Sequence, residues 1–150
     1  MLIETLTWGS LEVTEDHLYH FAKGIPGFDE ETEFALIDQG DGMFVYLQSV
    51  RDKGIAFLLV DPFLFYPAYE FELPEGDKEE LELDTDVVVR CIVTLKEKLE
   101  QSTINLLAPV VLNPTKRLGK QVVLHQVSYQ TKHPLWTESI QAGVSGKAGE

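Results

Sequence analysis

The sequence predicts an all-β, mostly antiparallel domain that forms a compact closed or semi-closed β-barrel-like structure with one or two short helical turns. Apolar residues recur with period-two alternation or in short runs, and Gly, Pro, Asp and Asn interrupt them at intervals of roughly 8–12 residues. In the stretch 44–47 both alternating sets are apolar, with Phe44 and Tyr46 in one and Val45 and Leu47 in the other. Such strands are typical of a sheet that wraps on itself or is covered on both faces.

The first predicted element is a β-hairpin. Residues 2–8 and 11–13 have strand character, and they flank Gly9 and Ser10, a pair suited to a two-residue turn because glycine accepts a positive φ. Turn residues separate the strands that follow. Those strands are predicted at residues 17–21, 33–37, 43–49, 55–60, 68–73, 87–95, 103–112 and 120–127.

Helical patterns are short and occur at two places. Asp77 and Glu80 have the spacing of a capping box, which predicts one or two helical turns running toward Leu83. A further turn is expected within residues 96–101. Neither stretch is long enough to organise the fold, so the strands are expected to do so.

Length and composition predict one domain. A chain of 150 residues, 44% of them hydrophobic, can bury a single ordinary core. We expect residues 1–140 to form this domain and the small, polar residues 141–150 to form a flexible tail. The apolar runs are too short for a membrane helix, and residues 1–10 lack the pattern of a secretory signal. The expectation is a cytoplasmic protein without membrane contact.

The charge of the chain is strongly negative and unevenly distributed. The formal net charge is −13; residues 1–86 hold 21 acidic and 4 basic residues, whereas residues 87–150 hold 4 acidic and 8 basic ones. Binding to a phosphate backbone draws on clustered Lys and Arg, so no direct nucleic-acid ligand is expected. The acidic field serves either solubility or the attraction of basic partners, and charge alone leaves both readings open.

No residue pattern predicts catalysis or a metal site. No serine lies in a G-x-S-x-G motif. His17 and His20 would point to opposite faces of a strand, so they are not expected to share a metal ion. The single cysteine, Cys91, lies in an apolar run and is expected in the core. We therefore expect a protein that is not an enzyme and that uses no cofactor and no metal.

An aromatic cluster precedes an acidic stretch. The aromatic residues are Phe63, Phe65, Tyr66, Tyr69 and Phe71. They either fill the barrel core or form a docking surface. Glu70 and Glu72 lie on the face opposite Tyr69, and residues 74–86 add seven acidic residues against one lysine. An acidic rim beside an aromatic patch would suit a basic amphipathic partner, and a solvated loop is the alternative reading.

Ordered motifs along nearly the whole chain carry a family resemblance. They are Gly24-Ile25-Pro26-Gly27-Phe28, Leu47-Gln48-Ser49, residues 57–62 ending in Asp61-Pro62, Tyr69, Val93-Thr94, Asn105-Leu106-Leu107-Ala108-Pro109, and Gln121 before an apolar strand. In their order and spacing, over residues 5–129, they resemble the flagellar assembly factor FliW family.

The resemblance implies a β-barrel-like regulator that is not an enzyme. It implies binding to the RNA-binding translational repressor CsrA, which is antagonised allosterically, and to newly made flagellin. Free flagellin would take the protein away from CsrA, and the released CsrA would shut off flagellin translation until flagellin is exported. Two alternatives remain: a dedicated cytosolic flagellin chaperone, and a barrel enzyme acting on a small ligand.

The motifs and the charge pattern together indicate the residues that bind partners. The expected residues are Phe28, Asp61, Pro62, Tyr69, Glu70, Glu72, Glu79, Glu80 and Asn105. A strongly acidic domain held beside a basic RNA-binding surface would weaken the attraction of that surface for phosphates. The sequence does not indicate which of these residues meets which partner.

Overall fold

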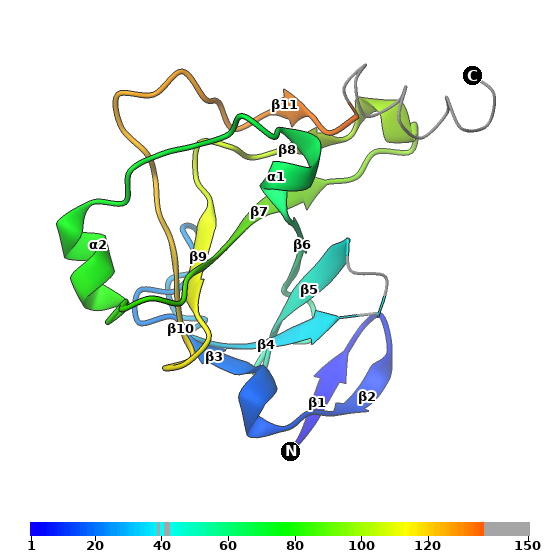
Figure 1. Cartoon of the computed structure of the whole chain (residues 1–150). Helices are drawn as coiled ribbons and strands as arrows, with labels where there is room; N and C mark the ends of the chain where they lie inside the picture. The colour runs from blue at the N-terminus through cyan, green and yellow to red at the C-terminus, as the bar shows by residue number, and fades with distance from the viewer. Residues whose placement is uncertain (39, 41–42, 137–150) are drawn as a thin grey trace.

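The computed structural model describes residues 1–38, 40 and 43–136, and it confirms the predicted all-β barrel class (Figure 1). Seven strands close the barrel: β3 (Leu18–His20), β4 (Glu33–Asp38), β5 (Phe44–Ser49), β6 (Ala56–Val60), β7 (Val88–Thr94), β9 (Val110–Asn113) and β10 (Leu118–Gln121). Neighbouring strands are antiparallel except β10 and β3. β7 completes the barrel because it pairs with both β6 and β9. The expected tail, residues 141–150, lies outside the described residues.

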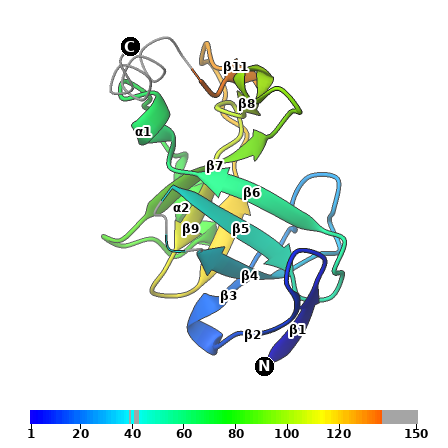
Figure 2. The ribbon, with the colours of Figure 1, turned by 90° about the vertical axis from the view of Figure 1, so that its right-hand side faces the viewer.

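Short elements extend the barrel at two opposite ends (Figure 1, Figure 2). At one end, β8 (Thr103–Ile104) pairs with β7, and β11 (His133–Pro134) pairs with β8. At the other end, β1 (Leu2–Thr5) and β2 (Gly9–Glu12) form a separate hairpin, followed by the 3-10 turn η1 (Glu15–His17). Within the described residues, no helix has the length and apolar content needed to cross a membrane.

Alternation along the barrel strands separates an inner core from outer ones. On β6, Phe57 and Leu59 face the inner core, whereas Leu58 and Val60 belong to an outer cluster. The side chains of β7 alternate in the same way between the inner core and the outer cluster, so both faces of β7 are covered. The buried residues of the inner core are Tyr19, Phe21, Ile25, Phe34, Leu47, Leu59, Val110 and Leu112. The expectation of strands covered on both faces is therefore correct.

The N-terminal hairpin forms as predicted, but its turn lies elsewhere. Thr5 pairs with Gly9, so residues 6–8 form the loop and the predicted two-residue turn at Gly9 and Ser10 is wrong. The Thr5 hydroxyl accepts a hydrogen bond from the Trp8 N–H at 2.8 Å and thereby holds the longer loop. Gly9 has φ +68°, a conformation in which glycine carries no steric penalty.

Three predicted strands differ in the structure. Residues 68–73 form no strand, although their burial alternates. The predicted strand 103–112 is split into β8 and β9, because residues 105–109 turn away from the sheet. The predicted strand 120–127 is a strand only at residues 120–121, which form the end of β10. Strand propensity was present in each case, and the tertiary pairing decided where a ladder forms.

Helix α1 (Pro62–Phe65) is a single turn that the strand pattern did not predict. Its start has a recognisable chemical cause, because the Asp61 carboxylate accepts a hydrogen bond from the Phe63 N–H at 2.9 Å. Pro62 occupies the first helical position, where its missing N–H costs nothing.

Helix α2 (Glu75–Glu80) begins two residues before the predicted capping box. Pro74 is its N-cap, and the Asp77 side chain is used for an ion pair. The expected turn within residues 96–101 is present as the 3-10 turn η2 (Leu99–Gln101).

We expect Gly119→Ala to destabilise the fold. Gly119 lies on β10 against the buried Phe21 ring, and a Cβ atom there would lie 2.5 Å from Phe21 Cε1. Overpacking of this kind costs about 1–3 kcal/mol, which urea denaturation followed by circular dichroism would measure. Gly76→Ala is the matched control, because nothing lies within 4 Å of its Cβ position in α2. Equal stability of the two variants would contradict this packing.

Candidate partner-binding site

The segment formed by residues 61–73 covers the outer face of β6 and β7. Phe65 and Tyr69 are buried there in a cluster with Cys91. The Tyr69 hydroxyl donates a hydrogen bond to the Leu106 carbonyl at 2.8 Å, and burial raises its pKa well above the usual value. Phe65 and Tyr69 are therefore core residues, as the first reading of the cluster expected, but their core cluster lies outside the barrel wall and not in the barrel interior.

The thiol of Cys91 shares this outer cluster. Burial raises its pKa to about 12, so the thiol stays protonated near neutral pH. Cys91 is fully buried, as the sequence led us to expect. Its neutral state fits a packing role and not a nucleophilic one.

An open hollow, which we call the aromatic groove, lies between this segment and the barrel wall. Its volume is about 420 Å³. The apolar lining includes Phe63, Tyr69, Phe71, Leu73, Val87, Val89 and Val111, and the charged lining is Glu70, Lys78 and Asp84. Phe63 is 42% exposed and Val87 48% exposed, so the groove displays apolar surface to solvent. Glu70 and Asp84, which belong to the acidic stretches noted in the sequence, lie beside the aromatic residues here.

Exposed carboxylates lie at the aromatic groove and on the segments that contribute to it. Glu70 lines it, Glu72 belongs to the same segment, and Glu79 lies on α2. All three residues are exposed. None of their carboxylates forms an ion pair or hydrogen bond with another of the described side chains. Their negative charge is therefore available to a partner.

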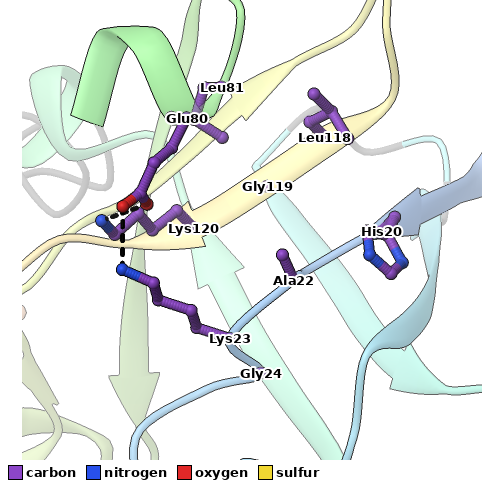
Figure 3. Close-up of a pocket in the computed structure, with 9 residues that line it drawn as sticks. All are labelled: His20, Ala22, Lys23, Gly24, Glu80, Leu81, Leu118, Gly119 and Lys120. Atoms are coloured by element: carbon purple, nitrogen blue, oxygen red, sulfur yellow. Dashed lines mark hydrogen bonds and ion pairs between the residues drawn. The ribbon is translucent and has the colours of Figure 1, made fainter. Parts of the chain in front are cut away.

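Helix α2 is held against the barrel by an ion-pair cluster (Figure 3). Lys120 on β10 bonds to the Asp77 carboxylate and to Glu80 Oε2, and Lys23 Nζ lies 2.8 Å from Glu80 Oε1. Burial lowers the pKa of Lys120, but the hydrogen bonds to Asp77 and Glu80 outweigh it, and the net pKa is raised. The hydrogen bonds from Lys120 and then Lys23 lower the pKa of Glu80. Glu80 is therefore a structural charge, unlike Glu79.

Comparison with known proteins identifies the family. A family model described as FliW protein matches residues 2–135. The chain belongs to the FliW family. The family resemblance drawn from the sequence motifs is thereby confirmed.

Curated FliW relatives match over almost their whole length. The flagellar assembly factor FliW of Bacillus subtilis (strain 168) is 45% identical over 142 residues, which cover 93% of this chain and 99% of the relative. That of Geobacillus sp. (strain WCH70) is 41% identical with the same coverage. A crystal structure of the flagellar assembly factor FliW superposes with a TM-score of 0.87 at 39% identity, covering 92% of this chain and 99% of that one. The barrel is therefore shared with a solved FliW.

Several motif residues maintain the FliW barrel. Gly24 has φ +66°, and a Cβ atom there would lie 2.6 Å from the Phe28 carbonyl oxygen, so only glycine fits. The Asn105 side-chain oxygen accepts hydrogen bonds from the N–H groups of Leu107 and Ala108 at 3.1 and 3.0 Å. Gln121 Nε2 donates to the Ala108 carbonyl at 3.0 Å. These contacts explain the motifs as turn chemistry.

Phe28 lies on a second, smaller hollow of the FliW barrel. This hollow has a volume of about 340 Å³ and contains Asp29, Glu30 and Glu31. The Phe28 ring is 40% exposed and meets Phe57 edge to face, with centroids 5.5 Å apart. Its role in binding stays a prediction.

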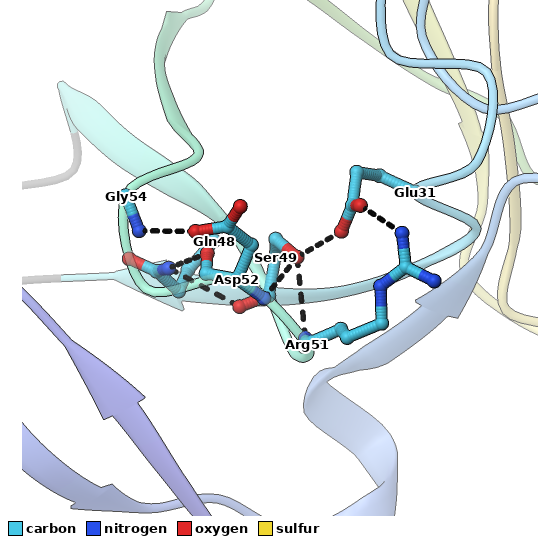
Figure 4. A network of polar contacts seen from close by, with 6 residues as sticks. All are labelled: Glu31, Gln48, Ser49, Arg51, Asp52 and Gly54. Atoms are coloured by element: carbon cyan, nitrogen blue, oxygen red, sulfur yellow. Dashed lines mark hydrogen bonds and ion pairs between the residues drawn. The ribbon is translucent and has the colours of Figure 1, made fainter.

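Glu31 is the buried carboxylate of this hollow, and a polar network holds it (Figure 4). The Ser49 hydroxyl donates to it at 2.6 Å and Arg51 Nη2 at 2.5 Å. The hydrogen bond from Ser49 and then that from Arg51 lower the pKa of Glu31. Gln48, buried beside them, donates to the Ser49 carbonyl at 3.1 Å. The Leu47-Gln48-Ser49 motif therefore stabilises the loop between β5 and β6.

Some of the expected partner-binding residues lie at the aromatic groove of this FliW structure, and others lie away from it. Tyr69 and Glu70 line the aromatic groove, and Asp61 and Pro62 start the helix that carries Phe63 to it. Glu72 and Glu79 are exposed on neighbouring stretches, whereas Glu80 is paired with lysines. Phe28 and Asn105 do not line the groove.

The sequence did not single out Val87, Val89 or Val111 as groove residues. Each belongs to an apolar run that is typical of strand interiors. The one indication in the sequence that Val87 is exposed is the acidic stretch that ends just before it, at Asp86. These valines come together only when β7 pairs with β9, so no local sequence pattern could have grouped them.

We expect Lys120→Met to loosen α2. The variant keeps the aliphatic stem but leaves Asp77 and Glu80 without their shared cation, which should cost about 1–3 kcal/mol. Hydrogen exchange of residues 75–80 should become faster. Lys116→Met is the control, because among the described residues the Lys116 ammonium pairs only with the exposed Glu82, at 3.6 Å. Unchanged exchange in α2 would refute the anchoring role.

A second prediction concerns acid stability. Because the folded-state pKa of Glu31 lies below its unfolded value of 4.5, its contribution is fully present above pH 4.5 and is lost as pH falls through the folded pKa. The urea midpoint of the wild-type protein should therefore fall in this acidic range more steeply than that of Glu31→Gln. Glu30→Gln is the control, because it removes the neighbouring carboxylate and keeps the contacts of Glu31 with Ser49 and Arg51. Parallel pH profiles for wild type and Glu31→Gln would rule this out.

Proposed function

We propose that this FliW-family protein is a non-enzymatic regulator of flagellin production in the cytoplasm. It binds the RNA-binding translational repressor CsrA, antagonises it allosterically, and is titrated by flagellin, so that flagellin translation follows flagellin export. The relatives that it matches are named flagellar assembly factors, which supports a role in building the flagellum through protein partners.

The acidic rim of the aromatic groove is the observation that carries the proposal. Glu70, Glu72 and Glu79 are exposed and uncompensated among the described side chains, beside an apolar surface large enough for a partner's side chains. A basic RNA-binding protein is attracted by such a field, and the field then opposes phosphates that approach the bound repressor. Neither direct contact with nucleic acid nor contact with a membrane is part of the proposal.

The filled barrel interior favours binding over catalysis. Its inner core consists of packed apolar side chains such as Phe21, Phe34 and Leu47. An enzyme acting on a small ligand in the barrel would need a deep pocket with convergent polar groups. In the described residues, no group of three or more His, Cys, Asp or Glu side chains is placed to hold a metal ion.

A flagellin chaperone is the second candidate function. The exposed apolar side chains Phe63, Leu64 and Val87 favour it, because they could shield sticky ends of flagellin subunits. A chaperone would depend on these apolar side chains, whereas the repressor antagonist depends on the acidic rim. Size-exclusion chromatography with the repressor and with flagellin, separately and together, distinguishes the two.

Neutralising the rim should weaken repressor binding. We expect the triple variant Glu70→Gln, Glu72→Gln, Glu79→Gln to lose roughly tenfold in affinity for CsrA at low salt, and wild-type binding to weaken as salt rises. Flagellin binding should change less. Isothermal titration calorimetry at several salt concentrations measures all three effects.

The control variant removes the same amount of charge at exposed positions that do not line the aromatic groove. Glu15→Gln with Asp16→Asn changes exposed acids of η1, and Glu97→Gln changes an exposed acid after β7. This triple variant should retain repressor binding. If both variants lose affinity equally, only the net charge matters, and salt-independent binding would disprove the electrostatic mechanism. If flagellin and CsrA exclude each other, each lowers the other's affinity by the same factor.

A further inference from the structure

Residues 69–73 have the side-chain pattern of a β-strand but no partner strand. Tyr69 is buried, and Phe71 and Leu73 are half-buried, whereas Glu70 and Glu72 are exposed. Strict alternation of this kind is the mark of an extended chain. The same stretch follows a smooth course between α1 and α2 on the outside of the barrel (Figure 1). It is an extended segment lying over the barrel without joining the sheet.

The backbone of this segment is almost unpaired. The Glu70 N–H donates to the Tyr129 hydroxyl at 3.1 Å. Among the described residues, the N–H and carbonyl groups of Phe71 and Leu73 take part in no hydrogen bond. In an extended chain the backbone groups of alternate residues point to the same edge, so Phe71 and Leu73 present theirs on the edge opposite that of Glu70.

The aromatic groove adjoins this segment and limits what could lie beside it. The opposite wall consists of Val87, Val89 and Val111, so apolar side chains are accommodated. Glu70 and Asp84 supply two negative charges to its lining, and Lys78 supplies one positive charge. A strand that entered the groove would direct alternate side chains to the valines and the remainder outward, toward carboxylates. The complementary sequence alternates apolar and basic residues.

We propose that residues 70–73 form an acceptor edge for β-augmentation by an extended segment of a protein partner in which apolar and basic residues alternate. The partner's backbone pairs with the free N–H and carbonyl groups of Phe71 and Leu73, and its basic side chains meet Glu70 and Asp84. Backbone pairing supplies affinity, and the groove and acidic residues supply selectivity. The inference takes one point from the proposed function, namely that the partner is a protein.

The first test uses synthetic peptides with the full chain. One octapeptide alternates Val and Lys, and the matched peptide has the same composition with Val at helical spacing. In titrations followed by amide NMR shifts, the alternating peptide should bind at least about tenfold more tightly. Stronger binding of the helically spaced peptide, or no saturable binding of the alternating one up to about 1 mM, would overturn the proposal.

The second test removes the peptide's own amide donors. Two versions of the alternating peptide are N-methylated, one on its Val residues and the other on its Lys residues. Because a paired strand uses one edge, one version should lose about tenfold in affinity and the other should not. Equal effects of the two versions would overturn backbone pairing.

Hydrogen exchange gives a readout on the protein itself. Saturation with the alternating peptide should slow exchange of the Phe71 and Leu73 amides, whereas those of Leu2 and Glu4 on the distant hairpin should not change. Unprotected amides at Phe71 and Leu73 would overturn the proposal. If the protein binds the repressor in chromatography but fails these tests, the proposed function stands and only the binding mode is wrong.

Discussion

The rest of the structure depends on burying both faces of β7. Val88 and Ile92 face the inner core, and Val89, Cys91 and Val93 face outward. Pairing with β6 and β9 closes the barrel around the inner set. The outer set needs a separate cover, which the segment 61–73 supplies with its aromatic side chains. That cover is incomplete over Val89, and the aromatic groove is the space that remains. The candidate site is therefore a consequence of how the barrel is closed and covered.

The negative charge of the chain divides into two kinds. Some carboxylates are structural: Glu31 is held by Ser49 and Arg51, and Glu80 by a lysine of β10 and a lysine of the loop after β3. Others, such as Glu72 and Glu79, are exposed without a cation among the described residues. Structural carboxylates maintain the fold whatever the partner is, whereas the exposed ones create a field at the groove. The formal charge of −13 does not separate these two roles, and the contacts do.

Most of the sequence motifs lie outside the proposed binding surface of this FliW-family protein, and Tyr69 belongs to both. Gly24 is required by a left-handed turn, and Asn105 and Gln121 satisfy backbone groups near Ala108. Such residues carry the family resemblance because few alternatives satisfy the same backbone geometry. Apart from Tyr69, the groove is lined mainly by valines and other apolar side chains, whose types are interchangeable enough to leave no motif. Motifs therefore led to the fold and the family, and charge and aromatic clustering led to the surface.

The sequence by itself determined the barrel class, the family and the fact that aromatic and acidic residues are concentrated within positions 63–84. Period-two alternation and turn chemistry are local, so they are legible without a structure. The tertiary structure alone decided which predicted strands acquire partners. Residues 68–73 have strand character but join no ladder within the described part of the chain, because β7 already pairs with β6 and β9. It also decided that Glu80 is neutralised and Glu79 is not, because the pairing lysines come from distant parts of the chain. Ladder partners and ion pairs depend on contacts between remote residues, which no local pattern contains.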